Sequence, residues 1–272
     1  MLDGPTRSPG PATFEIVGGE VRDGVLIRDI RVGDPRGDSE PIEAYLVEPE
    51  VLDARTGRPA LLFAHWFDTE APNGNRTQFV DEAVDWARRQ RAAAILPQLT
   101  FPWQADPSGS SADRERVTAE VDRLRRSLDV VLGRPAVDPD RVGVVGHDFG
   151  AMHATLLATA DGRPRAYVLI AAVPRWADWF LPFWPIEEDR IEYLAGMRPV
   201  DPIEHVGRAA PAKILFQVAR CDFFIAPMTG LELKRAAGEG AELKPYDAEH
   251  SMAVADALAD RTAFLEAALQ SG

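Results

Sequence analysis

The stretch Arg141-Val-Gly-Val-Val-Gly-His-Asp-Phe-Gly150 decides the fold of this chain. Its residues 142–145 are apolar and β-branched apart from one glycine, a pattern typical of a short, fully buried strand. Residues 151–160, directly after it, have a helical composition. Glycines stand two positions before and two positions after Asp148, where small residues let a strand and a helix approach closely. The stretch therefore predicts a strand, a sharp turn centred on Asp148, and a helix.

Strand and helix patterns alternate over most of the remaining chain. Three early segments, with Asp23-Gly24 as a hairpin signal, are expected to form an antiparallel edge: 14–21, 25–32 and 42–47. Later strands are expected at 60–64, 92–96, 166–173, 213–219 and 242–246. Helices are expected at 78–91, 113–132, 228–237 and 253–269. This alternation predicts an α/β protein, with a mostly parallel sheet and helices on both faces.

The sequence indicates one domain. Residues 1–12 are predicted to be a flexible tail, because they combine prolines and glycines without an apolar run. Residues 13–272 contain no repeat and no linker-like composition, so they are interpreted as a single domain. Residues 174–206 interrupt the alternation and are rich in aromatic residues and prolines. They are long enough to form a small cap over a site.

Composition limits the partners of this protein. The chain has 272 residues and a net charge of −13, which disfavours nucleic acid and anionic membrane surfaces as partners. Cys221 is the only cysteine, so no intramolecular disulfide can form. No apolar run approaches membrane-spanning length. We therefore expect a cytoplasmic protein that binds a small molecule. A homo-oligomer is compatible with the sequence, which does not determine the oligomeric state.

Three side chains that can carry chemistry follow predicted strands. Asp148 lies in the sharp turn, Asp222 follows the strand at 213–219, and His250 lies between the last strand and the terminal helix. The carboxyl ends of parallel strands meet at one edge of a sheet, so we expect these three side chains to lie close together. The order nucleophile, acid, histidine matches a catalytic triad built on a nucleophile elbow.

From Ala60 to the C-terminus, the sequence resembles the α/β-hydrolase superfamily. The run Val-Asp-Pro-Asp-Arg-Val-Gly-Val-Val-Gly-His at 137–147 is similar to dienelactone-hydrolase-type members. The elbow sequence Gly-His-Asp-Phe-Gly resembles the branch with an aspartate nucleophile, haloalkane dehalogenases and epoxide hydrolases. The resemblance implies a triad of Asp148, Asp222 and His250. It also implies an oxyanion hole formed by the backbone N–H groups of Phe67 and Phe149.

An aspartate at the elbow favours a particular reaction. A carboxylate is already ionised near neutral pH, and its attack on an sp³ carbon that carries a halide or an epoxide oxygen gives a stable alkyl ester. His250 would then activate the water that hydrolyses this ester, and Asp222 would orient His250. The primary hypothesis is therefore a cofactor-free hydrolase that cleaves carbon–halogen or epoxide carbon–oxygen bonds.

Two alternatives remain open at this stage. The dienelactone-like sequence allows a hydrolase of carboxylic esters or lactones, in which Asp148 acts as a general base for water. The usual residue at such an elbow is serine. An aspartate in its place also allows a binding protein that has the hydrolase fold without the chemistry. Formation of a covalent adduct on Asp148 distinguishes the primary hypothesis from both alternatives.

Aromatic residues are the candidates for the substrate pocket. We expect six residues to line it, although packing against the core explains the aromatic ones equally well: His65, Trp66, Trp176, Trp179, Trp184 and Tyr193. Trp66 stands where hydrolases of this type often have glycine. The five histidines show no metal-ligand spacing, and no cofactor-binding glycine motif is present, so neither a metal nor a cofactor is expected.

Overall fold

A computed structural model of the protein describes residues 13–34, 37, 40–51, 57–66, 75–90, 92–100 and 107–270. The predicted tail at 1–12 and the predicted oxyanion-hole residue Phe67 lie outside the described residues. Within the described ranges, no helix is long and apolar enough to cross a membrane.

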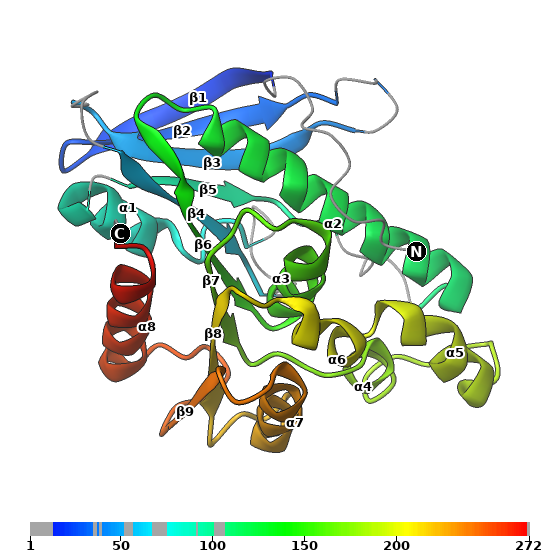
Figure 1. Ribbon diagram of the computed structural model, residues 1–272. Helices are drawn as coiled ribbons and strands as arrows, with labels where there is room; N and C mark the ends of the chain where they lie inside the picture. Colours follow the sequence, from blue (N-terminus) through cyan, green and yellow to red (C-terminus); the bar gives the residue numbers. More distant parts are fainter. Residues whose placement is uncertain are drawn as a thin grey trace.

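The described strands form one nine-stranded sheet with the order β1-β2-β3-β5-β4-β6-β7-β8-β9 (Figure 1). Their bounds are β1 Phe14–Arg22, β2 Val25–Val32, β3 Ile42–Pro49, β4 Arg58–Ala64, β5 Ala93–Pro97, β6 Val137–His147, β7 Ala166–Ile170, β8 Lys213–Ala219 and β9 Glu242–Tyr246. β1, β2 and β3 pair in antiparallel fashion, and β3 joins β5 in the same way. All other pairs are parallel. The predicted α/β class, with its antiparallel edge, is confirmed.

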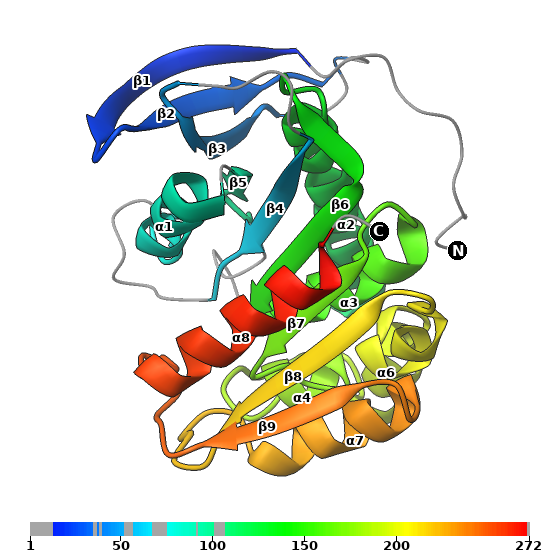
Figure 2. The same ribbon diagram turned by 60° about the vertical axis from the view of Figure 1, so that its left-hand side comes forward.

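Helices cover both faces of the sheet. The main ones are α1 Val80–Gln90, α2 Ser110–Leu132, α3 Phe149–Ala160, α7 Pro227–Ala237 and α8 Ala255–Ala268. α1 and α8 lie on one face, and α2, α3 and α7 lie on the other (Figures 1 and 2). Short helices follow β7. Four lie within the predicted cap at 174–206, namely α4 Trp176–Phe180, α5 Arg190–Met197, η1 Arg198–Val200 and α6 Pro202–His205, and η2 Val206–Arg208 begins at its last residue. They lie on the side of the sheet that α3 covers.

Local sequence explains the first hairpin. Asp23 and Gly24 both have positive φ angles, 52° and 74°, between the paired residues Arg22 and Val25. Two consecutive positive φ angles are what a tight two-residue turn with the correct strand twist requires, and Asp-Gly meets this requirement with little strain. The predicted hairpin signal therefore formed the expected turn.

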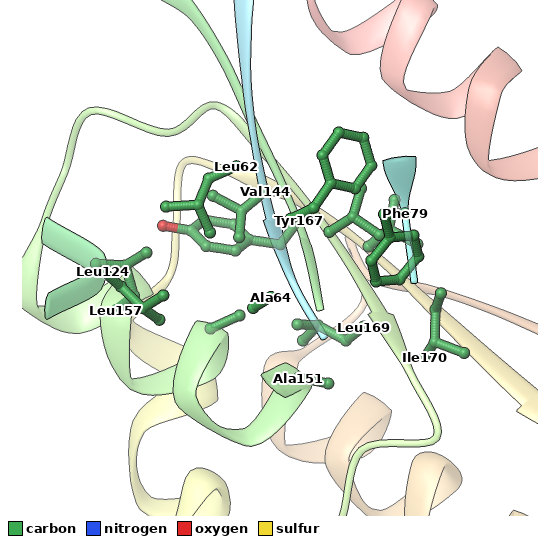
Figure 3. Close-up of a cluster of buried hydrophobic side chains, with 14 of the residues drawn as sticks. Leu62, Ala64, Phe79, Leu124, Val144, Ala151, Leu157, Tyr167, Leu169 and Ile170 are labelled. Atoms are coloured by element: carbon green, nitrogen blue, oxygen red, sulfur yellow. The ribbon is translucent and has the colours of Figure 1, made fainter. Parts of the chain in front are cut away.

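The core lies between the parallel strands and the helices (Figure 3). Leu62 of β4 and Val144 of β6 are fully buried side by side, and Leu124 of α2 and Leu157 of α3 are buried with them. Every residue of β4, β5 and β7 is buried, which explains why these strands are apolar without alternation, apart from Arg58 at the start of β4, which pairs with Glu48. The core fixes the ends of these strands, from which the candidate site residues project.

One expected strand is shorter in the structure. The apolar pattern predicted a strand over 166–173, but β7 ends at Ile170. Ala171 has a φ angle of 50°, which an extended strand cannot accommodate, and its N–H group donates to the Gln217 carbonyl oxygen at 2.9 Å. Hydrophobicity alone did not reveal this end, because 171–173 remain buried after the strand has stopped.

The turn at Asp148 depends on two glycines. A Cβ atom on Gly146 would lie 2.6 Å from the Ala151 Cα atom, and one on Gly150 would overlap the backbone carbonyl oxygens of Ala64 and His65. Both contacts are with backbone, so nothing flexible can give way. Close packing of β6, α3 and the end of β4 therefore requires glycine at both positions, as the sequence predicted.

We expect Gly150→Ala to lower the free energy of unfolding by about 1–3 kcal/mol, because the added methyl group forces backbone apart in a packed region. Denaturant unfolding followed by circular dichroism measures the loss. Gly162→Ala is the matched control, because a Cβ atom there meets nothing within 4 Å. Equal stability of the two variants would show that the elbow tolerates a side chain at position 150.

Candidate active site

Asp148 occupies the centre of a strained turn between β6 and α3. Its φ and ψ angles are 56° and −122°, a conformation that non-glycine residues rarely adopt. The Asp148 N–H group donates to the Ile170 carbonyl oxygen at 2.8 Å, and its carbonyl oxygen accepts from Ala151 and Met152 in the first turn of α3. The neighbouring strand β7 and the first turn of α3 thus hold the strained backbone, which has the geometry of a nucleophile elbow.

The two carboxylate oxygens of Asp148 have different surroundings. Oδ1 accepts a hydrogen bond from the Trp179 indole Nε1–H at 2.7 Å, and the Phe149 backbone N–H also donates to the carboxylate. Oδ2 lies 3.9 Å from His250 Nε2. Burial raises the pKa of Asp148, while the charge of His250 and the two hydrogen bonds oppose this rise. Oδ1 is therefore held by the indole donor, and Oδ2 faces the histidine.

His250 lies between two carboxylates. Its Nδ1 atom is 2.9 Å from Asp222 Oδ2, and the other Asp222 oxygen accepts from the N–H groups of Phe224 and Ile225, both at 2.9 Å. Burial lowers the pKa of His250, but the hydrogen bond to Asp222 and the charges of Asp148 and Asp222 outweigh it, so the net shift is upward. The structure thus brings together the three residues that the sequence singled out.

Aromatic rings surround the imidazole of His250. Trp66 stacks on it with a centroid distance of 5.5 Å and an interplanar angle of 9°. Phe224 contacts it edge-on at 5.2 Å, and the His147 ring lies 5.1 Å away. Burial, with the charge of His250, lowers the pKa of His147 well below its usual value. His147 is therefore neutral at physiological pH and does not add a second positive charge beside His250.

Sequence analysis did not identify Gln78 as a site residue. Its Oε1 atom accepts a hydrogen bond from the Trp66 backbone N–H at 2.8 Å, and its Nε2 atom lies 2.6 Å from His147 Nδ1. Gln78 thus connects the loop after β4 to the elbow and holds Trp66 over His250. No signal in the sequence could have indicated this role, because Gln78 precedes α1 in a segment without a motif.

The other predicted pocket residues differ in their contacts. Trp184 stacks on Trp179 at 5.1 Å, so both tryptophans connect to Asp148. Trp176 is buried and donates its indole N–H to the Val200 carbonyl oxygen, and the Tyr193 hydroxyl donates to Asp113. These hydrogen bonds lie within the helical segment after β7 and the start of α2, so the pocket role of Trp176 and Tyr193 stays a prediction.

His65 is oriented by backbone groups. Its Nδ1 atom lies 2.6 Å from the Trp66 carbonyl oxygen, and its Nε2 atom accepts from the Leu99 N–H group at 3.0 Å. Burial lowers its pKa to about 4, so the ring is neutral. Its role as a pocket residue remains a prediction, as does that of Phe149 in an oxyanion hole. In the described part of the chain, no group of three metal-ligating side chains is present.

We expect Asp222→Asn to lower the pKa of His250, because the substitution removes a negative charge while an amide oxygen can still accept from Phe224 and Ile225. The wild-type pKa lies above the ordinary 6.5, so protonation of His250 stabilises the fold. This stabilisation is fully present below pH 6.5 and is lost as the pH rises through the folded-state pKa.

An NMR titration of the His250 ring proton measures how far Asp222→Asn lowers the pKa of His250. Asp247→Asn, at an exposed ion pair with Arg220, is the control. An unchanged titration midpoint in the Asp222 variant would contradict the proposed coupling.

Trp179→Phe should raise the pKa of Asp148 further, because it removes a hydrogen bond to the ionised carboxylate and keeps an aromatic ring. If ionised Asp148 is required for turnover, the acid limb of the pH profile of kcat/KM moves to higher pH. Trp176→Phe is the matched control, since its indole N–H donates to Val200 and not to Asp148. The same acid limb in both variants would show that the indole hydrogen bond does not tune Asp148.

No protein-family model matches this chain, and no curated protein sequence matches it. Similar solved structures include an acetyl xylan esterase from Paenibacillus sp. R4, with a TM-score of 0.72 and 20% identity over 96% of this chain and 90% of that chain. An S-formylglutathione hydrolase from Agrobacterium tumefaciens has a TM-score of 0.68 and 14% identity, with 94% and 100% of the two chains covered. A glucuronoyl esterase from Solibacter usitatus has a TM-score of 0.65 and 13% identity, with 99% and 88% covered.

None of these three proteins is named as a dehalogenase or an epoxide hydrolase, so they lend no support to that part of the resemblance. At such low identity, the likeness establishes the arrangement of the chain rather than its substrate. This chain has the α/β-hydrolase fold, as its sequence resemblance implied.

Proposed function

We propose that this protein hydrolyses carboxylic esters or lactones, with Asp148 as the base that activates the attacking water and His250 as the acid that protonates the leaving alkoxide. The observation that carries the proposal is the 3.9 Å separation of Asp148 Oδ2 and His250 Nε2. A water molecule at hydrogen-bond distance, about 2.8 Å, from both atoms would form the apex of a triangle on this base. The similar structures support the choice of substrate, since two of the three named above are esterases.

The proposed reaction starts from ionised Asp148 and protonated His250. Asp148 takes a proton from water as the oxygen attacks the carbonyl carbon, and the tetrahedral intermediate then expels the alkoxide. His250 gives its proton to the alkoxide, and Asp148 passes its own proton to His250 to restore the starting state. One water is consumed, and one acid and one alcohol are formed. Asp222 keeps the Nε2 atom of His250 directed at the reacting groups through the hydrogen bond at Nδ1.

The electrostatics suit this exchange. Burial raises the pKa of Asp148, which makes the carboxylate a better proton acceptor than an exposed aspartate. The net upward shift of the His250 pKa favours the protonated imidazole that must serve as the acid. An acid and a base with pKa values moved toward neutrality are what general acid–base catalysis at physiological pH needs.

Carbon–halogen or epoxide cleavage is the second candidate, and one observation favours it. Donors from Trp179 and Phe149 already point at the Asp148 carboxylate, while Oδ2 remains directed at His250. If Oδ2 attacked an sp³ carbon, an alkyl ester of Asp148 would form. A halide would leave, whereas an epoxide ring would open to an alkoxide that stays attached to the alkyl group and takes a proton from solvent. When water then attacked the carbonyl carbon of this ester, negative charge would develop on Oδ1. The Trp179 indole N–H that donates to Oδ1 would stabilise the resulting tetrahedral intermediate.

Asp148→Asn tests the role of the carboxylate. The amide keeps the size of the side chain but cannot accept a proton from water, so we expect kcat on short aryl esters to fall by about 10²–10⁴-fold. Unfolding measurements check that the fold is retained, and Asp247→Asn serves as the control. Turnover near the wild-type rate would remove Asp148 from the mechanism. Ligand binding without turnover in the wild type would instead favour a binding protein.

His250→Gln separates the two candidates. Attack by Asp148 on an alkyl carbon needs no base, whereas hydrolysis of the resulting ester needs His250. If carbon–halogen or epoxide cleavage occurs, this variant should accumulate an adduct on Asp148 after incubation with a 1-bromoalkane or a terminal epoxide. Peptide mass spectrometry detects and locates the adduct. An unmodified variant, with a compound that the wild type converts, would exclude the alkyl-ester route and leave water activation as the mechanism.

A further inference from the structure

An apolar cluster at the surface is continuous with the candidate catalytic residues. We call it the aromatic rim and define it by four residues, Phe183, Trp184, Phe223 and Phe224. A circuit of contacts begins and ends at Asp148, whose carboxylate accepts from Trp179. The ring-centroid distances between successive residues are 5.1 Å from Trp179 to Trp184, 5.9 Å to Phe183, 6.0 Å to Phe224 and 5.2 Å to His250. The circuit closes where His250 Nε2 lies 3.9 Å from Asp148 Oδ2.

The exposed fraction of the side chains rises from Trp179 beside Asp148 to the phenylalanines of the rim. Trp179 is 5% exposed beside Asp148, whereas Phe183 is 48%, Phe224 54% and Phe223 85% exposed. Rings that leave about half or more of their area in water gain less from folding than buried rings do. Scattered exposed phenylalanines would need no explanation, but Phe183 and Phe223 both contact Phe224, which in turn contacts His250. The rim is therefore a surface suited to bind an apolar group.

Two separate segments supply the rim. Phe183 and Trp184 follow α4, and Phe223 and Phe224 follow β8, directly after Asp222. The backbone N–H group of Phe224 donates to Asp222, so the turn that positions the acid also positions a rim residue. A substrate that contacts this surface would thus lie beside the imidazole of His250.

Charge restricts what can bind there. None of the four rim residues is charged, and the rim contacts His250, which lies between the carboxylates of Asp148 and Asp222. Even with His250 protonated, this group carries a net negative charge. A substrate with its own carboxylate next to the reacting bond would be repelled. An uncharged apolar group meets no such penalty.

We propose that the aromatic rim binds the aromatic or other bulky apolar group of an uncharged substrate, adjacent to the bond that is hydrolysed. This inference rests on the proposed function and names its substrate class. Contact of the rim with His250 commits the surface to the substrate rather than to a second copy of the chain, and the experiment below distinguishes these occupants.

The test compares an aromatic and a small substrate. Phe183→Ala and Phe223→Ala, alone and combined, are assayed on benzyl acetate and on ethyl acetate, because neither ring contacts His250 or Asp222 directly. Loss of one buried ring contact should raise KM for benzyl acetate by about tenfold. The kcat for benzyl acetate and the KM for ethyl acetate should change much less. Ile16→Ala, an exposed apolar residue on β1 at the far edge of the sheet, is the matched control and should change neither. Equal effects on both substrates, or none, would overturn the proposal.

Binding is measured separately from turnover. Isothermal titration of benzyl acetate into Asp148→Asn, with and without the two phenylalanine substitutions, reports on the rim without hydrolysis. If binding depends on the rim but the wild type hydrolyses no ester, the proposed function is rejected and the rim remains a binding surface. If the wild type hydrolyses esters but binding does not depend on the rim, the proposed function stands and the role of the rim is rejected. If sedimentation shows that the substitutions dissociate an oligomer, the rim is an interface between copies and the proposal is wrong.

Discussion

The positive φ angle of Asp148 is the constraint on which the site depends. At 56°, the backbone turns sharply enough to end β6 and begin α3 within one residue, and this turn presents the carboxylate at the edge of the sheet. Gly146 and Gly150 permit the turn, because a side chain at either position would collide with backbone. The cost of the strained residue is offset by its hydrogen bonds with Ile170 of the adjacent strand β7 and with the first turn of α3.

Charge pairing then determines how the three titratable residues behave together. Asp148 and Asp222 are both buried on opposite sides of His250, so neither carboxylate can rely on water for solvation. The positive charge of the imidazolium partly offsets the two negative charges, and the two carboxylates in turn raise the pKa of His250. The aromatic surroundings, with Trp66 stacked on the ring, restrict its orientation. Removing one member of this set would leave a buried charge without its partner, which explains why their roles cannot be assigned one by one.

The fold and the elbow residue favour different reactions. The structures similar to this chain include esterases, and its framework follows theirs over nearly its whole length. A carboxylate at the elbow, however, forms a stable product with an alkyl group and a reactive anhydride with an acyl group. Water activation reconciles the two, because Asp148 then transfers protons and forms no bond to the acyl group. The indole N–H that donates to Oδ1 is the feature that favours the alkyl route.

Local sequence determined the alternation of strands and helices, the Asp23-Gly24 turn and the elbow, since periodicity, turn chemistry and small flanking residues act over a few positions. It also placed Asp148, Asp222 and His250 at strand ends, from which their proximity followed by topology. Trp184 was expected at the pocket, but the role of Gln78 and the contact of Phe183 with Phe224 could not be predicted, because these contacts join segments far apart in the chain. The same holds for the Trp179 hydrogen bond to Asp148, since composition does not show which of several tryptophans faces the elbow. Only the packing of the helices after β7 against α3 decided that.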